Sequence, residues 1–64
     1  MKILYEASQK QRQIRFSGTV KGLIVKLRLQ PNATLIARDN VLLTDQDRVN
    51  DKDSLLVMSV VSGG

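Results

Sequence analysis

The beginning of the chain alternates between apolar and polar residues in two short runs. From Lys2 to Ala7 one apolar set recurs at every second position, which is the period of a β-strand with one buried face. A second alternating run covers residues 12–16, and the polar stretch 8–11 between the two runs has the length of a turn. Two alternating runs joined in this way predict an antiparallel hairpin.

The period changes after Gly18, where a helical pattern begins. Four apolar residues fall at i, i+3, i+4 and i+7, the spacing of one helix face, and they are Val20, Leu23, Ile24 and Leu27. Thr19 is suited to the N-cap, because its hydroxyl can accept a hydrogen bond from an unpaired amide of the first turn. The pattern predicts a helix over residues 20–28 that ends before Pro31, since proline disfavours α geometry in the preceding residue. Gly22 conflicts with this helix and costs about 1 kcal/mol relative to alanine.

Three more strands are predicted in the second half of the chain, at Thr34–Arg38, Val41–Leu43 and Ser54–Ser59. Asp39 and Asn40 are expected to form the turn between the first two of these strands. Residues 44–53 form a polar loop in which only Val49 is expected to be buried. A hairpin, one helix and three further strands predict an α+β domain with two layers, in which the helix covers one face of a mixed sheet.

The predicted core takes one face of each strand and the apolar face of the helix. Its members are Ile3, Tyr5, Ile14, Phe16, Val20, Leu23, Ile24, Leu27, Leu35, Ala37, Leu43, Val49, Leu55 and Val57. Residues of the opposite parity should lie on the open face of the sheet, away from the helix. The apolar residues expected on that face are Leu4, Ile36, Leu56 and Met58.

The composition of the chain excludes most catalytic chemistry. The chain has 64 residues, of which 42% are hydrophobic, which suits one small folded domain but not a second domain or a deep cleft. Cysteine and histidine are absent, so the chain can build no disulfide, thiolate nucleophile or imidazole base. We therefore predict a chain that is no enzyme, with no catalytic residue, no metal and no bound cofactor of its own.

The acidic loop 45–53 has some features of a calcium-binding loop, but its spacing is wrong. Counted from Asp45, the sixth residue is Asn50 and the twelfth is Leu56, where an EF-hand needs a glycine and a bidentate glutamate. We expect these aspartates to form turns instead.

The chain is basic, with ten Lys and Arg residues against six Asp and Glu residues and a net charge of +4. A phosphate-binding surface could be formed by the basic residues of the hairpin and the helix, which are Lys10, Arg12, Arg15, Lys21, Lys26 and Arg28. Proteins that bind single strands usually add exposed aromatic residues, whereas Tyr5 and Phe16 occupy core-facing positions. We favour a solvated basic surface without a nucleic-acid partner. The alternative is a small basic module that binds RNA or protein without covalent chemistry.

Two features predict a cytoplasmic protein without a membrane partner. Glu6 interrupts the apolar stretch that a signal peptide would need. No apolar run approaches the roughly 18 residues of a membrane-spanning helix.

The sequence closes on Gly63 and Gly64, shortly after the last predicted strand. Glycines at a terminus pack nothing and are typical of a frayed end, but without β-carbons they can also thread a narrow channel of another protein. A terminal carboxylate is ionised at neutral pH, and it can attack the α-phosphate of ATP to give an acyl-adenylate. We predict a folded domain over residues 1–59 and a flexible tail over residues 60–64 that carries this carboxylate.

This element order and the closing Gly-Gly resemble the ubiquitin-like β-grasp proteins, and within them the small sulfur carriers of the ThiS/MoaD family. Residues 53–64 look like the closing strand and tail of that family, residues 42–49 like the preceding segment, and residues 19–24 like the helix entry. The resemblance implies that Gly64 is adenylated by a ubiquitin-activating-type adenylyltransferase, which uses ATP, and is then converted to a thiocarboxylate.

The same resemblance implies partners rather than an activity of the chain itself. It implies a sulfur donor and a downstream sulfur-accepting enzyme that serves thiamine, molybdopterin or tRNA thiolation. Some members of the family are also attached to protein lysines through the same terminus. The chain would be a protein co-substrate of these partners.

We expect the activating partner to bind the open face of the sheet, because an apolar patch that leads to a reactive tail is typical of a docking surface. The predicted partner-binding residues are Leu4, Ile36, Leu56, Met58 and Val61, with Arg15 and Arg38 at the flanks. The two arginines are expected to pair with acidic groups of the partner.

Overall fold

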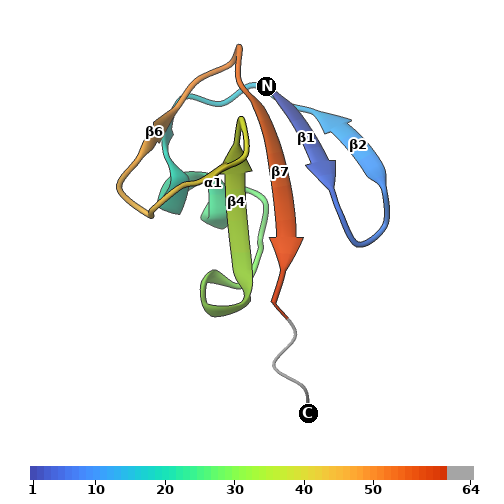
Figure 1. Cartoon of the computed structure of the whole chain (residues 1–64). Coiled ribbons are helices and arrows are strands. Elements are labelled where there is room, and N and C mark those ends of the chain that lie inside the picture. The colour runs from blue at the N-terminus through green and yellow to red at the C-terminus, as the bar shows by residue number, and fades with distance from the viewer. Residues whose placement is uncertain (61–64) are drawn as a thin grey trace.

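A computed structural model describes residues 1–60 of the chain. Its elements are β1 (Lys2–Tyr5), β2 (Lys10–Gln13), β3 (Gly18–Thr19), α1 (Val20–Lys26), η1 (Pro31–Ala33), β4 (Thr34–Arg38), β5 (Val41–Leu42), β6 (Arg48–Val49) and β7 (Ser54–Ser59). One mixed sheet has the strand order β2-β1-β7-β4-β5, and β3 pairs with β6 in a separate two-stranded sheet. Helix α1 packs across one face of the larger sheet (Figure 1).

The first and last strands of the described chain meet in the middle of the sheet. Strand β7 lies between β1, to which it is parallel, and β4, to which it is antiparallel. Strands β2 and β5 form the two edges, each in an antiparallel hairpin with its neighbour. A mixed sheet with one helix across one face confirms the predicted α+β class and is consistent with a ubiquitin-like β-grasp.

The first hairpin is present, but its turn lies earlier in the chain than the pattern indicated. The turn covers residues 6–9, and β2 follows at once. Gln9 reverses the chain with φ 57, and its amide donates a hydrogen bond to the Tyr5 carbonyl oxygen at 2.7 Å. Ile14 and Phe16 therefore follow β2 instead of lying within it, and they pack against the core from the connection to β3.

Helix α1 begins where the sequence predicts. The Thr19 hydroxyl oxygen accepts a hydrogen bond from the Gly22 amide at 3.2 Å, so the N-cap prediction is confirmed. The helix is only seven residues long and ends at Lys26 rather than at Arg28. In the described part of the chain, no helix is long and apolar enough to cross a membrane.

A Schellman motif, rather than proline, ends the helix. The Leu29 amide donates to the Ile24 carbonyl oxygen at 3.0 Å. The Arg28 amide donates to the Val25 carbonyl oxygen at 3.1 Å. These two bonds satisfy carbonyl groups of the last turn, and they require the left-handed backbone that Arg28 adopts with φ 57. The proline further along opens the short 3-10 helix η1 instead.

Gly22, which weakens the helix, gives the Phe16 ring room to approach its backbone. A β-carbon at Gly22 would lie 3.3 Å from Phe16 Cζ, and one at Gly18 would lie 3.1 Å from the same atom. Both contacts are closer than an ordinary van der Waals distance. The packing of an aromatic ring therefore offsets the low helix propensity of Gly22.

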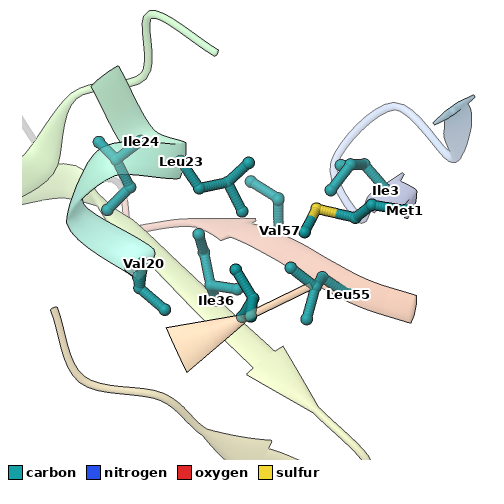
Figure 2. Packing of buried hydrophobic residues seen from close by; sticks show 9 residues of the cluster. Met1, Ile3, Val20, Leu23, Ile24, Ile36, Leu55 and Val57 are labelled. Atoms are coloured by element: carbon teal, nitrogen blue, oxygen red, sulfur yellow. The ribbon is translucent and has the colours of Figure 1, made fainter. Parts of the chain in front are cut away.

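The core lies between α1 and the sheet (Figure 2). Its buried residues are Met1, Ile3, Val20, Leu23, Ile24, Ile36, Val49, Leu55 and Val57. Six partly buried side chains pack around them, from Tyr5, Ile14, Phe16, Leu27, Leu29 and Leu43. Most of the predicted core is therefore confirmed, including Val49 in the polar loop. Among the described residues, no polar side chain is buried.

Strand β4 buries Ile36 in place of Leu35, while Ala37, also predicted in the core, is buried. Ile36 is 1% exposed and pairs with Val57. Leu35, which was expected in the core, is 41% exposed and pairs with Met58. Because paired residues of a ladder share a face, this register places Ile36 in the core and Leu35 on the open face. The prediction was wrong because residues 35–37 are all apolar, so alternation does not identify the buried position.

Candidate functional site

The open face of the sheet, opposite α1, carries an apolar row that crosses four strands. Leu4 on β1 pairs with Leu56 on β7. Leu56 also pairs with Ala37 on β4, and Ala37 pairs with Leu42 on β5. Residues paired across strands project from the same face, so the four side chains lie next to one another.

A second apolar row, formed by Leu35 and Met58, lies closer to the end of β7. We call the two rows the open-face patch, which comprises Leu4, Leu35, Ala37, Leu42, Leu56 and Met58. Leu42 is 57% exposed, Ala37 is buried, and the remaining members are exposed or half-buried. A shallow hollow of about 250 Å³ lies beside Leu4 and Leu56. A contiguous exposed apolar surface of this kind is typical of a protein contact site.

Three of the four apolar residues predicted for this face lie on it, namely Leu4, Leu56 and Met58. The fourth, Ile36, lies in the core and has almost no surface to offer a partner. Leu35 takes its place on the open face, because the two residues are adjacent on β4 and point in opposite directions.

Leu42 was not predicted as part of this face, although the sequence holds a signal for it. Asp39 and Asn40 both have positive φ, 53 and 65, as the two central residues of a type I′ turn require. A two-residue turn pairs the residues on either side of it, so Ala37 must face Leu42 one step further along the hairpin. The two-residue turn, rather than the alternation of apolar residues, therefore places Leu42 at the edge of the patch.

Arg38 does not flank the open-face patch as predicted, and Arg15 lies beyond the end of β2. Arg38 shares the parity of the buried face, and its Nη1 donates to Asp53 Oδ2 at 3.0 Å and to the Arg48 carbonyl oxygen at 3.1 Å. Arg15 follows β2 and lines a shallow hollow together with Asp51. Both arginines therefore lie toward the end of the sheet where β7 begins.

The aspartates of the acidic loop serve the backbone of the loop. Asp47 Oδ2 accepts a hydrogen bond from the Thr44 amide at 2.7 Å, and Asp53 Oδ2 accepts one from the Asn50 amide at 2.8 Å. Asp51 Oδ1 accepts a hydrogen bond from the amide of Phe16, which lies in the segment before β3. The predicted turn-forming role is confirmed for Asp47 and Asp53, whereas Asp51 makes a long-range bond instead. Within residues 1–60, no group of three or more acidic residues is arranged to hold a metal ion.

A further hollow lies where β7 ends. It has a volume of about 430 Å³ and is lined by Arg28, Leu29, Gln30, Ala33, Thr34, Ser59 and Val60. The Val60 amide donates to the Ala33 carbonyl oxygen at 2.8 Å, which holds the last described residue against the start of β4. We call this feature the tail-exit hollow, because residues 61–64 follow Val60. The sequence gives no direct signal for it, since its residues come from three separate segments.

The reactive end of the predicted site lies outside the described residues. Val61, Gly63 and Gly64 belong to this part of the chain. The structure therefore shows the surfaces around the base of the predicted tail: the open-face patch on one side of β7 and the tail-exit hollow at its end.

The sequence is similar to that of a known sulfur carrier. It is 29% identical over 62 residues to the Sulfur carrier protein TtuB of Thermus thermophilus, and the aligned region covers 97% of this chain and 95% of that protein. No family model matches the chain. The similarity along almost the whole length, on a β-grasp-like fold, confirms the resemblance to the ThiS/MoaD-like sulfur carriers.

Proposed function

We propose that this β-grasp protein, which resembles the ThiS/MoaD-like sulfur carriers over almost its whole length, is a sulfur carrier with Gly64 as its activated terminal residue. The observation that supports this most directly is the similarity to TtuB over 97% of the chain. The last strand, β7, is followed in the sequence by the Gly63-Gly64 pair that such a carrier would present. The chain is then a protein substrate of partner enzymes, and the catalytic groups belong to those partners.

The proposed chemistry takes place at the carboxylate of Gly64. A carboxylate oxygen attacks the α-phosphate of ATP, pyrophosphate leaves, and an acyl-adenylate forms. Hydrosulfide supplied by the sulfur donor then attacks the acyl carbon, AMP leaves, and loss of the sulfur-bound proton gives the thiocarboxylate without any change of oxidation state. A ubiquitin-activating-type adenylyltransferase binds the ATP, while this chain supplies only the carboxylate and the surfaces that orient it.

The sulfur then passes to a downstream sulfur-accepting enzyme. The family resemblance allows thiamine, molybdopterin and tRNA thiolation as destinations. Attachment to protein lysines through the same activated terminus is a second use that the resemblance allows. We expect these partners in the cytoplasm, which is the location predicted from the sequence.

The open-face patch is the docking surface proposed for the adenylyltransferase. Leu35 and Met58 form the part of the patch nearest the end of β7, and therefore nearest to the residues that lead to Gly64. Burial of these side chains against the enzyme holds the domain in one orientation. Binding of the folded domain thereby positions the short terminal segment for reaction.

Intact mass spectrometry of the protein purified from its own host tests the proposal. We expect a species heavier by the replacement of one oxygen with sulfur, and fragmentation should place the change at Gly64. Deletion of Gly64 should abolish ATP-dependent pyrophosphate release with the adenylyltransferase while leaving the thermal midpoint unchanged, since no core residue is removed.

Two results would contradict the proposal. One is a mature protein in which further residues permanently follow Gly64. The other is undiminished ATP consumption by the chain that lacks Gly64. Co-purification with RNA and without any terminal sulfur would instead support the non-covalent basic module.

A further inference from the structure

The C-terminal end of α1 carries an arginine where the backbone favours glycine. Arg28 has φ 57 and occupies the left-handed position of the Schellman motif that ends the helix. Glycine is the usual residue at this position, because a β-carbon is strained in the left-handed conformation. Arg28 is exposed, and among residues 1–60 its side chain makes no hydrogen bond or ion pair. The helix dipole favours a cation here, but the geometry of the Schellman motif itself does not require an arginine.

Arg28 also lines the tail-exit hollow, and among the described residues that line it, Arg28 alone is charged. Polar groups of Gln30, Thr34 and Ser59 form part of the same wall. Val60, the last residue before the predicted reactive segment, lines the hollow as well. The hollow thus combines one cation, several hydrogen-bonding groups and the point from which the chain continues toward Gly64.

The acidic residues of the molecule are concentrated elsewhere. Five of the six lie in residues 39–53, between the end of β4 and the start of β7. The sixth, Glu6, follows β1 at the end of the sheet where β7 finishes. Lys10 and Lys26 lie in elements that reach that same end, together with Arg28. Among the described residues, this end of the molecule therefore carries three basic side chains and one acidic one.

From this arrangement we infer that the tail-exit hollow receives an acidic side chain of the adenylating enzyme, and that Arg28 binds its carboxylate. The inference rests on the proposed function and adds to it the chemistry of the partner surface. Four residues separate Val60 from the end of Gly64, and they span at most about 14 Å. An enzyme that acts on Gly64 must therefore bring its own surface close to this hollow. A guanidinium can hold a carboxylate through two parallel hydrogen bonds, so Arg28 is a positioning residue.

Substitution of Arg28 separates this role from a structural one, because the two effects have opposite signs. Arg28→Gly relieves the backbone strain and should raise the thermal midpoint of the free protein. The same variant should bind the purified adenylyltransferase several-fold more weakly in calorimetric titration, because the guanidinium is gone. Arg28→Glu should weaken binding by about tenfold or more, and Arg28→Lys should recover part of the loss.

Lys21→Glu is the matched control. It makes the same change in net charge, but in the first turn of α1, whereas Arg28 follows the other end of the helix. It should change the dissociation constant much less than Arg28→Glu, and the difference between the two variants should shrink as salt is added.

The outcomes distinguish the inference from the function on which it rests. If the wild-type chain supports ATP-dependent pyrophosphate release, but Arg28→Gly and Arg28→Glu bind as tightly as wild type, only the role of Arg28 is overturned. An equal loss of binding in Lys21→Glu would also overturn the role of Arg28, because it would show that net charge, and not a specific contact, controls binding. If the wild-type chain supports no pyrophosphate release, both the function and the inference are wrong.

Discussion

Two adjacent residues of β4 decide which surface of the sheet a partner can touch. Ile36 packs in the core opposite Val57, while Leu35 projects from the open face beside Met58. The alternation of side chains along a strand makes these two neighbours structurally opposite. The same substitution at the two positions must therefore have different consequences.

Ile36→Asp is expected to unfold the domain, whereas Leu35→Asp should leave it folded. Loss of a buried isoleucine side chain typically costs about 2–5 kcal/mol, and an unpaired buried carboxylate adds to that cost. Leu35 is 41% exposed, so its replacement should change the free energy of unfolding by roughly 1 kcal/mol or less. Urea denaturation followed by circular dichroism measures both. Equal stability of the two variants would show that the register of β4 is wrong.

Residue-level expectations were accurate where the pattern is simple. Leu55 and Val57 alternate with Leu56 and Met58 along β7, and the structure buries the predicted pair. The face of β4 could not be read in the same way, because three apolar residues follow one another in that strand. Only its hydrogen-bond register with β7 resolves that ambiguity, and register is a property of the assembled sheet.

At the scale of elements, α1 depends on its ends because it has only seven residues. Isolated helices of this length are unstable in water, so capping and tertiary packing must hold it. Its first turn is anchored by the Thr19 cap and by backbone bonds from Val20 and Lys21 to the loop that contains Asp45 and Asp47. The beginning of the helix is therefore joined to the segment that leads into β6.

Thr19→Ala should lower the free energy of unfolding by about 1 kcal/mol, since it removes the hydroxyl that accepts a bond from the Gly22 amide. Thr19→Ser retains the hydroxyl and should behave nearly as wild type. Thr44→Ala, at an exposed threonine of the acidic loop, provides a second control. Urea midpoints at constant m-value measure the effect. A Thr19→Ala variant as stable as Thr19→Ser would rule out a contribution of this cap.

An element could be predicted where the residues that determine it lie within it or next to it in the sequence. Strands β4 and β7 have the predicted bounds, because alternation and flanking turn residues lie within them. The pair β3–β6 was not predicted at all, since it joins Gly18 to Val49 across a large part of the chain. The early end of α1 was also missed, because an arginine in the left-handed conformation carries no recognised stop signal.

At the scale of the whole molecule, the sheet has one face devoted to stability and one that is available for binding. Helix α1 and the core cover the first face, and the open-face patch occupies the second. The patch spans the strands on both sides of β7, which is the strand that leads toward Gly64. The general position of this surface was expected from the sequence, whereas its full membership required the strand order.

Met58→Asp and Leu35→Asp should weaken binding to the adenylyltransferase by at least about tenfold, or about 1.4 kcal/mol, without unfolding the domain. Both substitutions place a charge in the part of the open-face patch nearest the end of β7. Val41→Asp is the matched control, because Val41 is 61% exposed but pairs with Arg38, whose parity is opposite to that of the patch. Calorimetric titration measures the dissociation constants. Unchanged binding in both patch variants would mean that the enzyme docks elsewhere.

The central position of β7 has a consequence for how the protein is made. Residues 54–59 are translated last among the described elements, yet they fill the gap between β1 and β4. On the ribosome, β1 and β4 of a nascent chain therefore have no strand between them until this segment emerges. The sheet can be completed only at that late stage. A chain that stops before β7 exposes unpaired strand edges, which favour aggregation and removal by proteases. Because β7 directly precedes the segment that ends in Gly64, quality control of folding removes the chains that stop before this segment begins.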